Sequence, residues 1–174
     1  MARFLNNPSY RGVEGERFVW DLCEPLWFRD NQGRAWCMPE GFRHDKRSSP
    51  WFLWNWAPPS TGQADRPWTF HDFMQRCFEL LGLKQSEVDG DLFRQAMLAV
   101  GKSERRAVWH SRAVRLGAFL LGTGDGNGVH RDERFNAPVW CREAKRQMPL
   151  KTWVELHYKP DGKGYREKVL PVDS

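Results

Sequence analysis

The spacing of apolar side chains changes once along this chain, and that change limits the possible folds more than any other feature. Before residue 39 apolar side chains alternate, as at Phe18, Trp20 and Leu22, which is typical of strands. Between residues 68 and 121 they recur every three or four positions, which is typical of helices packed on one face. The pattern predicts an α+β domain with antiparallel β-hairpins and three helices around an aromatic-rich core.

Two β-hairpins are expected, one on each side of the helical part. The turn-forming run Asp30–Gly33 separates two alternating segments, so residues 24–38 are predicted to pair. Near the C-terminus, alternating apolar residues from Leu150 to Tyr158 predict a strand. That strand is expected to turn at Pro160–Gly164 and to return from there.

Three helices are expected, over residues 68–83, 87–100 and 104–121, because each range carries an apolar stripe. The polar residues 1–16 are expected to be an arm without a core of its own. Residues 17–122 are expected to form the core domain. Residues 123–174 are then a Gly-rich loop and hairpin that extend the same domain.

Composition excludes several classes of protein. The net charge of +5 comes from Lys and Arg residues mixed with Asp and Glu, which favours an ordinary solvated surface over nucleic-acid binding. No apolar run approaches the roughly 20 residues that cross a bilayer, and residues 1–10 lack the apolar segment of a signal peptide. The four cysteines show no CxxC pair and no regular zinc spacing. We therefore expect a soluble protein, made in the cytoplasm, with free and mostly buried thiols.

Ten tryptophans in 174 residues are unusual, and three of them, Trp51, Trp54 and Trp56, lie in one short segment. Tryptophan rings usually anchor either a hydrophobic core or an interface. Core packing is the first interpretation of this segment. The second is a surface that binds another protein.

The segment before these tryptophans carries polar groups on a Pro-bounded loop. Asp45 and Ser48 lie between Gly41 and Pro50. A carboxylate held in this way can bind a metal ion or orient an imidazole. It can equally accept hydrogen bonds from the backbone of its own loop, which is the commoner use of Asp and Ser.

The dipeptide His71-Asp72 is the second candidate for chemistry. Adjacent helical residues point about 100° apart, so the two side chains can serve different purposes in one pocket, one as a base and one as a metal ligand. The structural alternative pairs Asp72 with Arg76, four residues later. Asp89 and Asp91 follow on the next expected helix, and either could hold His71 if the two helices are antiparallel. Their alternative role is to stabilise a helix N-terminus.

Four short strings occur in order along the chain: Met38–Phe42 followed by Asp45, Ser48, Pro50 and Trp54; His71–Phe73; Phe93–Gly101; and Ala113–Gly117. Together they resemble the family of domain of unknown function 1353, which is found mostly in phages and prophages. The resemblance covers about residues 17–122. His44 stands where the family usually has Thr, and the family's later Asp would fall at Gly90, which Asp89 and Asp91 flank. The resemblance implies a phage protein but defines no activity.

A more distant resemblance suggests a mechanism. The spacing of His71-Asp72 and the later acids is similar to that in the phospholipase A2-like domains of parvovirus capsids. There, the His activates water, the adjacent Asp binds calcium and the later Asp orients the His. The resemblance assigns these catalytic roles to His71, Asp72 and Asp89 or Asp91, with a divalent cation, calcium first, on Asp72 and Asp45.

Three functions remain open at this point. The first is a phage accessory hydrolase acting on lipid or the cell envelope. The second is a non-enzymatic virion or tail-assembly component that docks on other virion proteins through Trp51, Trp54 and Trp56. The third is an inhibitor of a host factor. The expected location is the host cytoplasm or the virion.

Overall fold

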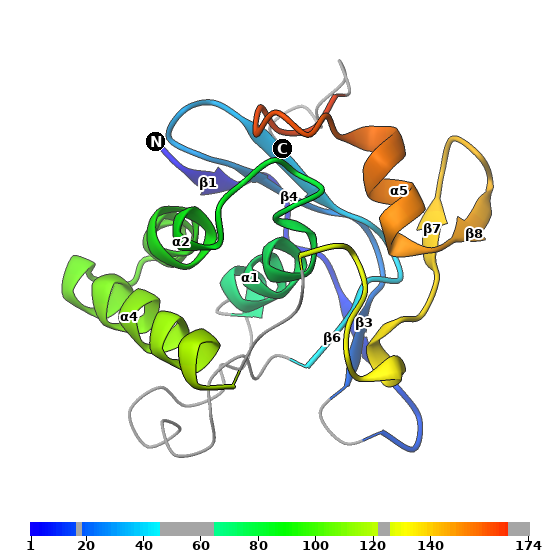
Figure 1. Ribbon diagram of the computed structural model, residues 1–174, viewed down its shortest axis with the longest axis horizontal. Coiled ribbons are helices and arrows are strands. Elements are labelled where there is room, and N and C mark those ends of the chain that lie inside the picture. Colours follow the sequence, from blue (N-terminus) through cyan, green and yellow to red (C-terminus); the bar gives the residue numbers. More distant parts are fainter. Residues whose placement is uncertain (17–18, 46–64, 122–125, 167–174) are drawn as a thin grey trace.

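The computed structural model describes residues 1–16, 19–45, 65–121 and 126–166. Ser48, Trp51, Trp54 and Trp56 lie outside the described residues. In Figure 1, helix α1 lies centrally, with α2 and α4 on one side and β3, β6, β7, β8 and α5 on the other. The architecture is α+β, as the change of apolar spacing predicted. No helix in the described ranges is long and apolar enough to cross a membrane.

Three small antiparallel sheets form the β part. Their orders are β1-β4-β5, β2-β3-β6 and β7-β8. The strands are β1 (Arg3–Phe4), β2 (Tyr10–Gly12), β3 (Trp20–Leu22), β4 (Leu26–Arg29), β5 (Ala35–Met38), β6 (Arg43–His44), β7 (Val139–Cys141) and β8 (Arg146–Met148).

The first predicted hairpin is confirmed. Strands β4 and β5 pair antiparallel, from Leu26 opposite Met38 to Arg29 opposite Ala35. Asp30 Oδ1 closes the turn by accepting hydrogen bonds from the backbone nitrogens of Gln32 and Arg34, both at 2.9 Å. This is a local use of an Asp side chain that favours a turn over a continuing strand.

The expectation of an arm without a core at residues 1–16 is wrong. Strand β1 pairs with β4 and β2 pairs with β3, and the side chains of Ala2 and Leu5 are buried. Strand β3 ends before Pro25, which has no amide hydrogen for a ladder. Strands β3 and β4, on either side of this proline, join different sheets.

The helices are α1 (Asp65–Cys77), α2 (Gln85–Glu87), the π-helical turn η3 (Val88–Leu92), α3 (Phe93–Ala99), α4 (Glu104–Leu121), the 3-10 turn η4 (Glu133–Phe135) and α5 (Leu150–His157). The elements α2, η3 and α3 follow one another without a gap, so they match the second predicted helix. Helix α4 has the bounds that were predicted. Helix α1 begins and ends earlier than predicted, and residues 78–82 form turns.

The second predicted hairpin is wrong at its first strand. Residues 150–157 form helix α5, whose buried side chains are Leu150, Trp153, Val154 and His157. These positions have helical spacing. In the folded chain this helical pattern prevails over the alternating apolar pattern that predicted a strand. The turn at residues 160–164 is present, and Tyr158 and Tyr165 form an isolated antiparallel bridge across it.

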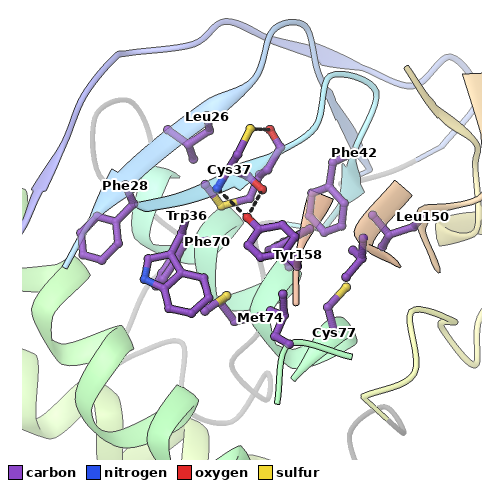
Figure 2. Close-up of a cluster of buried hydrophobic side chains, with 14 of the residues drawn as sticks. Leu26, Phe28, Trp36, Cys37, Phe42, Phe70, Met74, Cys77, Leu150 and Tyr158 are labelled. Carbon is purple, nitrogen blue, oxygen red and sulfur yellow. Dashed lines mark hydrogen bonds between the residues drawn. The ribbon is translucent and has the colours of Figure 1, made fainter. Parts of the chain in front are cut away.

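An aromatic cluster fills the space between the β4-β5 hairpin, α1 and the C-terminal segment (Figure 2). Trp36, Phe28 and Phe70 are fully buried in it. The hydroxyl of Tyr158 accepts a hydrogen bond from Cys37 N at 2.7 Å and donates one to Cys37 O at 2.8 Å. The residues after α5 therefore belong to the same core as the first hairpin.

Candidate functional site

Helix α1 has two packed faces, and the candidate residues lie on both. On one face Phe73 packs edge-on against Phe42, the residue just before β6, with ring centroids 5.6 Å apart. On the other face Trp68 and His71 pack against Phe93 of α3, at 5.0 and 4.6 Å between centroids. The opening of the family-like segment therefore packs on α1, but His71 faces α3 and η3.

His71 pairs with Asp89. Its Nε2 lies 2.9 Å from Asp89 Oδ1, and both side chains are almost completely buried. Gln75, one helical turn after His71, donates from its side-chain amide to the same oxygen. The hydroxyl of Ser111 on α4 donates to the backbone oxygen of Asp89. Two side chains of α1 thus hold the carboxylate, and α4 holds the backbone of the same residue.

Asp89, rather than Asp91, is the acid that faces His71. Asp89 lies in η3, where the backbone departs from α-helical spacing, and it points toward α1. Such turns are rare in proteins overall, but where they occur they are often at functional sites. Asp91 is exposed and accepts a hydrogen bond from Gln95 Nε2 at 2.8 Å. Gln75 was not singled out from the sequence, although its position four residues after His71 is a usable signal.

The imidazole of His71 lies between two carboxylates. Its Nδ1 is 3.9 Å from Asp72 Oδ1, and it makes no hydrogen bond to any residue in the described ranges. Burial by itself lowers the pKa of His71, but the nearby carboxylates of Asp72 and Asp89 together outweigh burial and raise the pKa to about 9. The ring therefore carries a positive charge at neutral pH.

Arg76 supplies a second buried cation, next to Asp72. Its guanidinium donates to the backbone oxygens of Phe135, at 2.8 Å, and Arg43, and it stacks over the ring of Phe42. Burial lowers its pKa, and the charges of Asp72 and Asp45 act in the opposite direction. Asp45 therefore lies within electrostatic reach of Arg76.

This arrangement does not fit calcium. Calcium takes roughly six to eight oxygen ligands. Around Asp72 the described side chains include an imidazolium and a guanidinium, both of which repel a cation. Ser48 lies outside the described residues. Asp45 as a partner of His71 stays a prediction.

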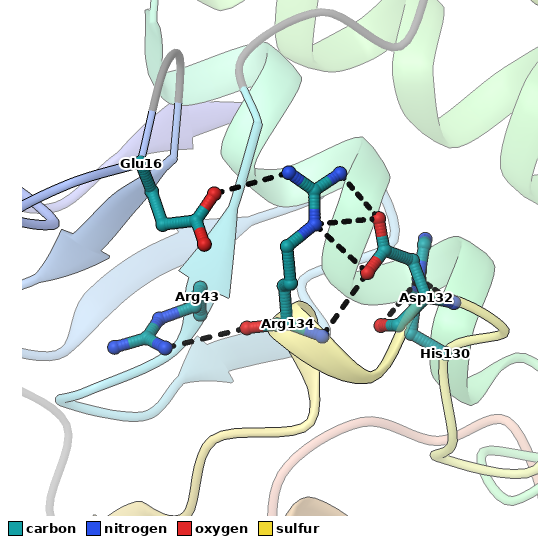
Figure 3. Close-up of polar contacts among 5 residues, drawn as sticks. All are labelled: Glu16, Arg43, His130, Asp132 and Arg134. Atoms are coloured by element: carbon teal, nitrogen blue, oxygen red, sulfur yellow. Dashed lines mark hydrogen bonds and ion pairs between the residues drawn. The ribbon is translucent and has the colours of Figure 1, made fainter.

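An exposed polar network connects the N-terminal segment to the region after α4 (Figure 3). Arg134 binds Glu16 at 3.0 Å and Asp132 through several hydrogen bonds, and its backbone oxygen accepts from Arg43 at 3.3 Å. His130 accepts a hydrogen bond from Asp132 N at 3.0 Å through Nδ1. Exposed ion pairs of this kind contribute little stability. We therefore interpret the network as one that positions the segments beside Arg76.

A comparison with protein families matches residues 20–114 to a family described as protein of unknown function (DUF1353). The matched range runs from β3 into α4 and contains His71, Asp72 and Asp89. No match was found among curated proteins or solved structures. Strands β1, β2, β7 and β8 and helix α5 lie outside the matched range. Because the match covers more than half of the chain, this protein belongs to the DUF1353 family.

Proposed function

We propose that this protein is a phage-encoded hydrolase in which His71 activates water and Asp89 holds the imidazole. The substrate class is an ester of a lipid or of the cell envelope. One observation carries the proposal: His71 Nε2 lies 2.9 Å from Asp89 Oδ1. When the ring is neutral, its Nε2–H donates to Asp89, and Nδ1 keeps the lone pair that can accept a proton from water.

Two further features support this role. His71 Nδ1, the atom that would act as the base, makes no hydrogen bond to a described residue, and Asp72 Oδ1 lies 3.9 Å from it. Asp89 lies in a π-helical turn, a feature enriched at functional sites. The lipid substrate class comes from the resemblance to the phospholipase A2-like domains of parvovirus capsids. Metal ions play no part in the proposed step.

The charge of His71 sets a condition on the reaction. Only the neutral imidazole accepts a proton, and the two carboxylates hold the pKa of His71 at about 9. Hydrolysis is therefore expected to increase as the pH rises toward this value. A structural His-Asp pair has no reason to produce such a profile.

The test uses the full chain, mixed vesicles of phosphatidylcholine and phosphatidylglycerol, and release of fatty acid as the readout. His71→Gln and Asp89→Asn are expected to lower the rate by at least about 100-fold, the scale of general-base catalysis. Asp91→Asn is the matched control, since Asp91 is an acid two residues away that bonds Gln95 instead of His71. A chelator is expected to leave the rate unchanged.

The wild-type pH profile keeps the test decisive if the variants unfold. No release of fatty acid at any pH from about 6 to about 10 would contradict the proposal. The same is true if Asp91→Asn and Asp89→Asn lower the rate equally. Either result would favour the non-enzymatic alternative, docking on virion proteins through Trp51, Trp54 and Trp56, which lie outside the described residues.

A further inference from the structure

A second cluster of reactive side chains lies outside the range matched to the family. Cys141 ends β7, Glu143 lies in the turn between β7 and β8, and His157 ends α5. In Figure 1 these elements lie at the right of the molecule, away from α2 and α4. The cluster is thus separate from the His71 site. Nothing in the sequence marks this cluster, because Cys141 and His157 are 16 positions apart and show no recognised spacing.

The donor atoms of these three residues converge. Cys141 Sγ donates to Glu143 Oε2 at 3.3 Å, and His157 Nε2 lies 3.2 Å from the same oxygen. One sulfur, one nitrogen and one oxygen all lie within 4.8 Å of one another. Around a tetrahedral zinc ion, bond lengths of about 2.0 to 2.3 Å place neighbouring donor atoms roughly 3.3 to 3.8 Å apart. The three side chains therefore need only small shifts to share one ion.

The backbone sets the orientation and protonation of the imidazole. His157 Nδ1 lies 2.8 Å from Trp153 O. A carbonyl oxygen can only accept a hydrogen bond, so Nδ1 carries a proton, and in the neutral ring Nε2 has a lone pair. Because Nε2 faces a carboxylate oxygen at 3.2 Å, either a proton or a metal ion lies between the two atoms. In a metal-binding His, the ring nitrogen that does not bind the metal usually donates a hydrogen bond, often to a backbone carbonyl as here.

The site is rigid on one side and open on the other. The His157 ring stacks between Trp153 and Tyr165, with centroids 4.4 and 5.4 Å away. An open depression of about 550 Å³ adjoins the cluster, lined by Cys141, Glu143, Ala144, Leu156, His157 and Arg166. The positive charge of Arg166 opposes a cation, but a thiolate and a carboxylate together outweigh it. An open fourth position is typical of zinc sites that bind water or a substrate.

We propose that Cys141, Glu143 and His157 bind one zinc ion, with the fourth position open to this depression. Sulfur, nitrogen and oxygen donors form a set that zinc accepts, whereas calcium and magnesium prefer oxygen alone. Binding displaces the thiol proton of Cys141, since the thiolate is the ligand. The site is independent of the proposed hydrolase function.

Calorimetry with zinc chloride tests the site on the full chain, kept reduced and first stripped of metal. One equivalent is expected to bind, and cobalt chloride is expected to give the thiolate-to-cobalt absorption of a tetrahedral site. Glu143→Gln, Cys141→Ser and His157→Gln are each expected to weaken zinc binding by at least about 100-fold, more than the loss of an outer partner. Glu143 is half exposed, so its variant is not expected to disturb the fold.

Each variant has a matched control that should bind zinc like the wild type. Cys23→Ser replaces an exposed thiol, and Glu155→Gln replaces an exposed acid on α5. His110→Gln replaces a His whose Nδ1 also bonds the carbonyl four residues earlier, that of Arg106. Absence of zinc binding at about 10 μM, or equal weakening by Glu143→Gln and Glu155→Gln, would overturn the proposal. Cobalt spectra without the thiolate band would overturn it as well.

Discussion

The two histidine clusters of this protein are held in opposite ways. In the family region, His71 lies between two carboxylates, is 4% exposed and carries a charge inside the fold. In the C-terminal extension, His157 is oriented by a backbone carbonyl, and its carboxylate partner Glu143 is 52% exposed. A buried charge that depends on buried partners should be essential to stability. Glu143, at a half-exposed position, can be altered with little effect on the fold.

The largest expected effect concerns the junction of the two regions. Gly82, in the family region, has φ of +70°, and a Cβ there would lie 2.5 Å from the backbone of Pro160 in the extension. Gly82→Ala is expected to lower the free energy of unfolding by about 4 kcal/mol, from the clash and the unfavourable φ together. Gly101→Ala is the control, since Gly101 has φ of +80° and open space around its Cβ position. It should cost about 1 kcal/mol by denaturant titration. Equal losses would show that the two regions do not pack as tightly as described.

The next effect is the pH dependence of stability. In the folded protein the pKa of His71 is raised to about 9 from its ordinary value of 6.5. The stabilisation is fully present below pH 6.5 and is lost as the pH rises through 9, amounting to about 3 kcal/mol. Denaturant titrations from about pH 6 to about pH 10 should show this fall in the wild type but not in His71→Gln. A flat difference between the two proteins would mean that His71 is neutral in the fold.

Removal of one buried partner should have a smaller effect. Asp89→Asn is expected to cost about 2 kcal/mol at neutral pH, because it leaves the His71 charge with one carboxylate. Asp91→Asn, at an exposed position, is expected to change the unfolding free energy by less than about 0.5 kcal/mol. Thermal unfolding at matched pH measures both. A larger loss for Asp91→Asn would reverse the roles assigned to the two acids.

The smallest effect is expected in the extension. Without zinc, Glu143→Gln should change the unfolding free energy by less than about 0.5 kcal/mol, since this side chain is half exposed. With zinc at about 100 times its dissociation constant, the wild type should gain about 2.7 kcal/mol and the variant much less. If Glu143→Gln changed the unfolding free energy by the same amount with and without zinc, the cluster would not be a zinc site.

Local patterns in the sequence determined much of the family region. Helix α4 and the β4-β5 hairpin could be predicted because apolar spacing, caps and the turn at Asp30 act over a few residues. The resemblance in the four short strings also identified the family, which the match over residues 20–114 confirms. The candidate residues His71, Asp72 and Asp89 were visible as residue types, although their geometry was not.

Only the tertiary structure decided which acid meets His71, that residues 150–157 are helical, and that Cys141 and His157 lie together. Each depends on contacts between residues far apart in the chain. Asp89 and Asp91 point about 200° apart on a helix, so the packing of η3 on α1 decides which of them meets His71. Alternation from Leu150 to Tyr158 favoured a strand locally, but burial of Trp153 and His157 on one face selects a helix. Sequence patterns report local preference, whereas these outcomes depend on which distant surfaces are buried together.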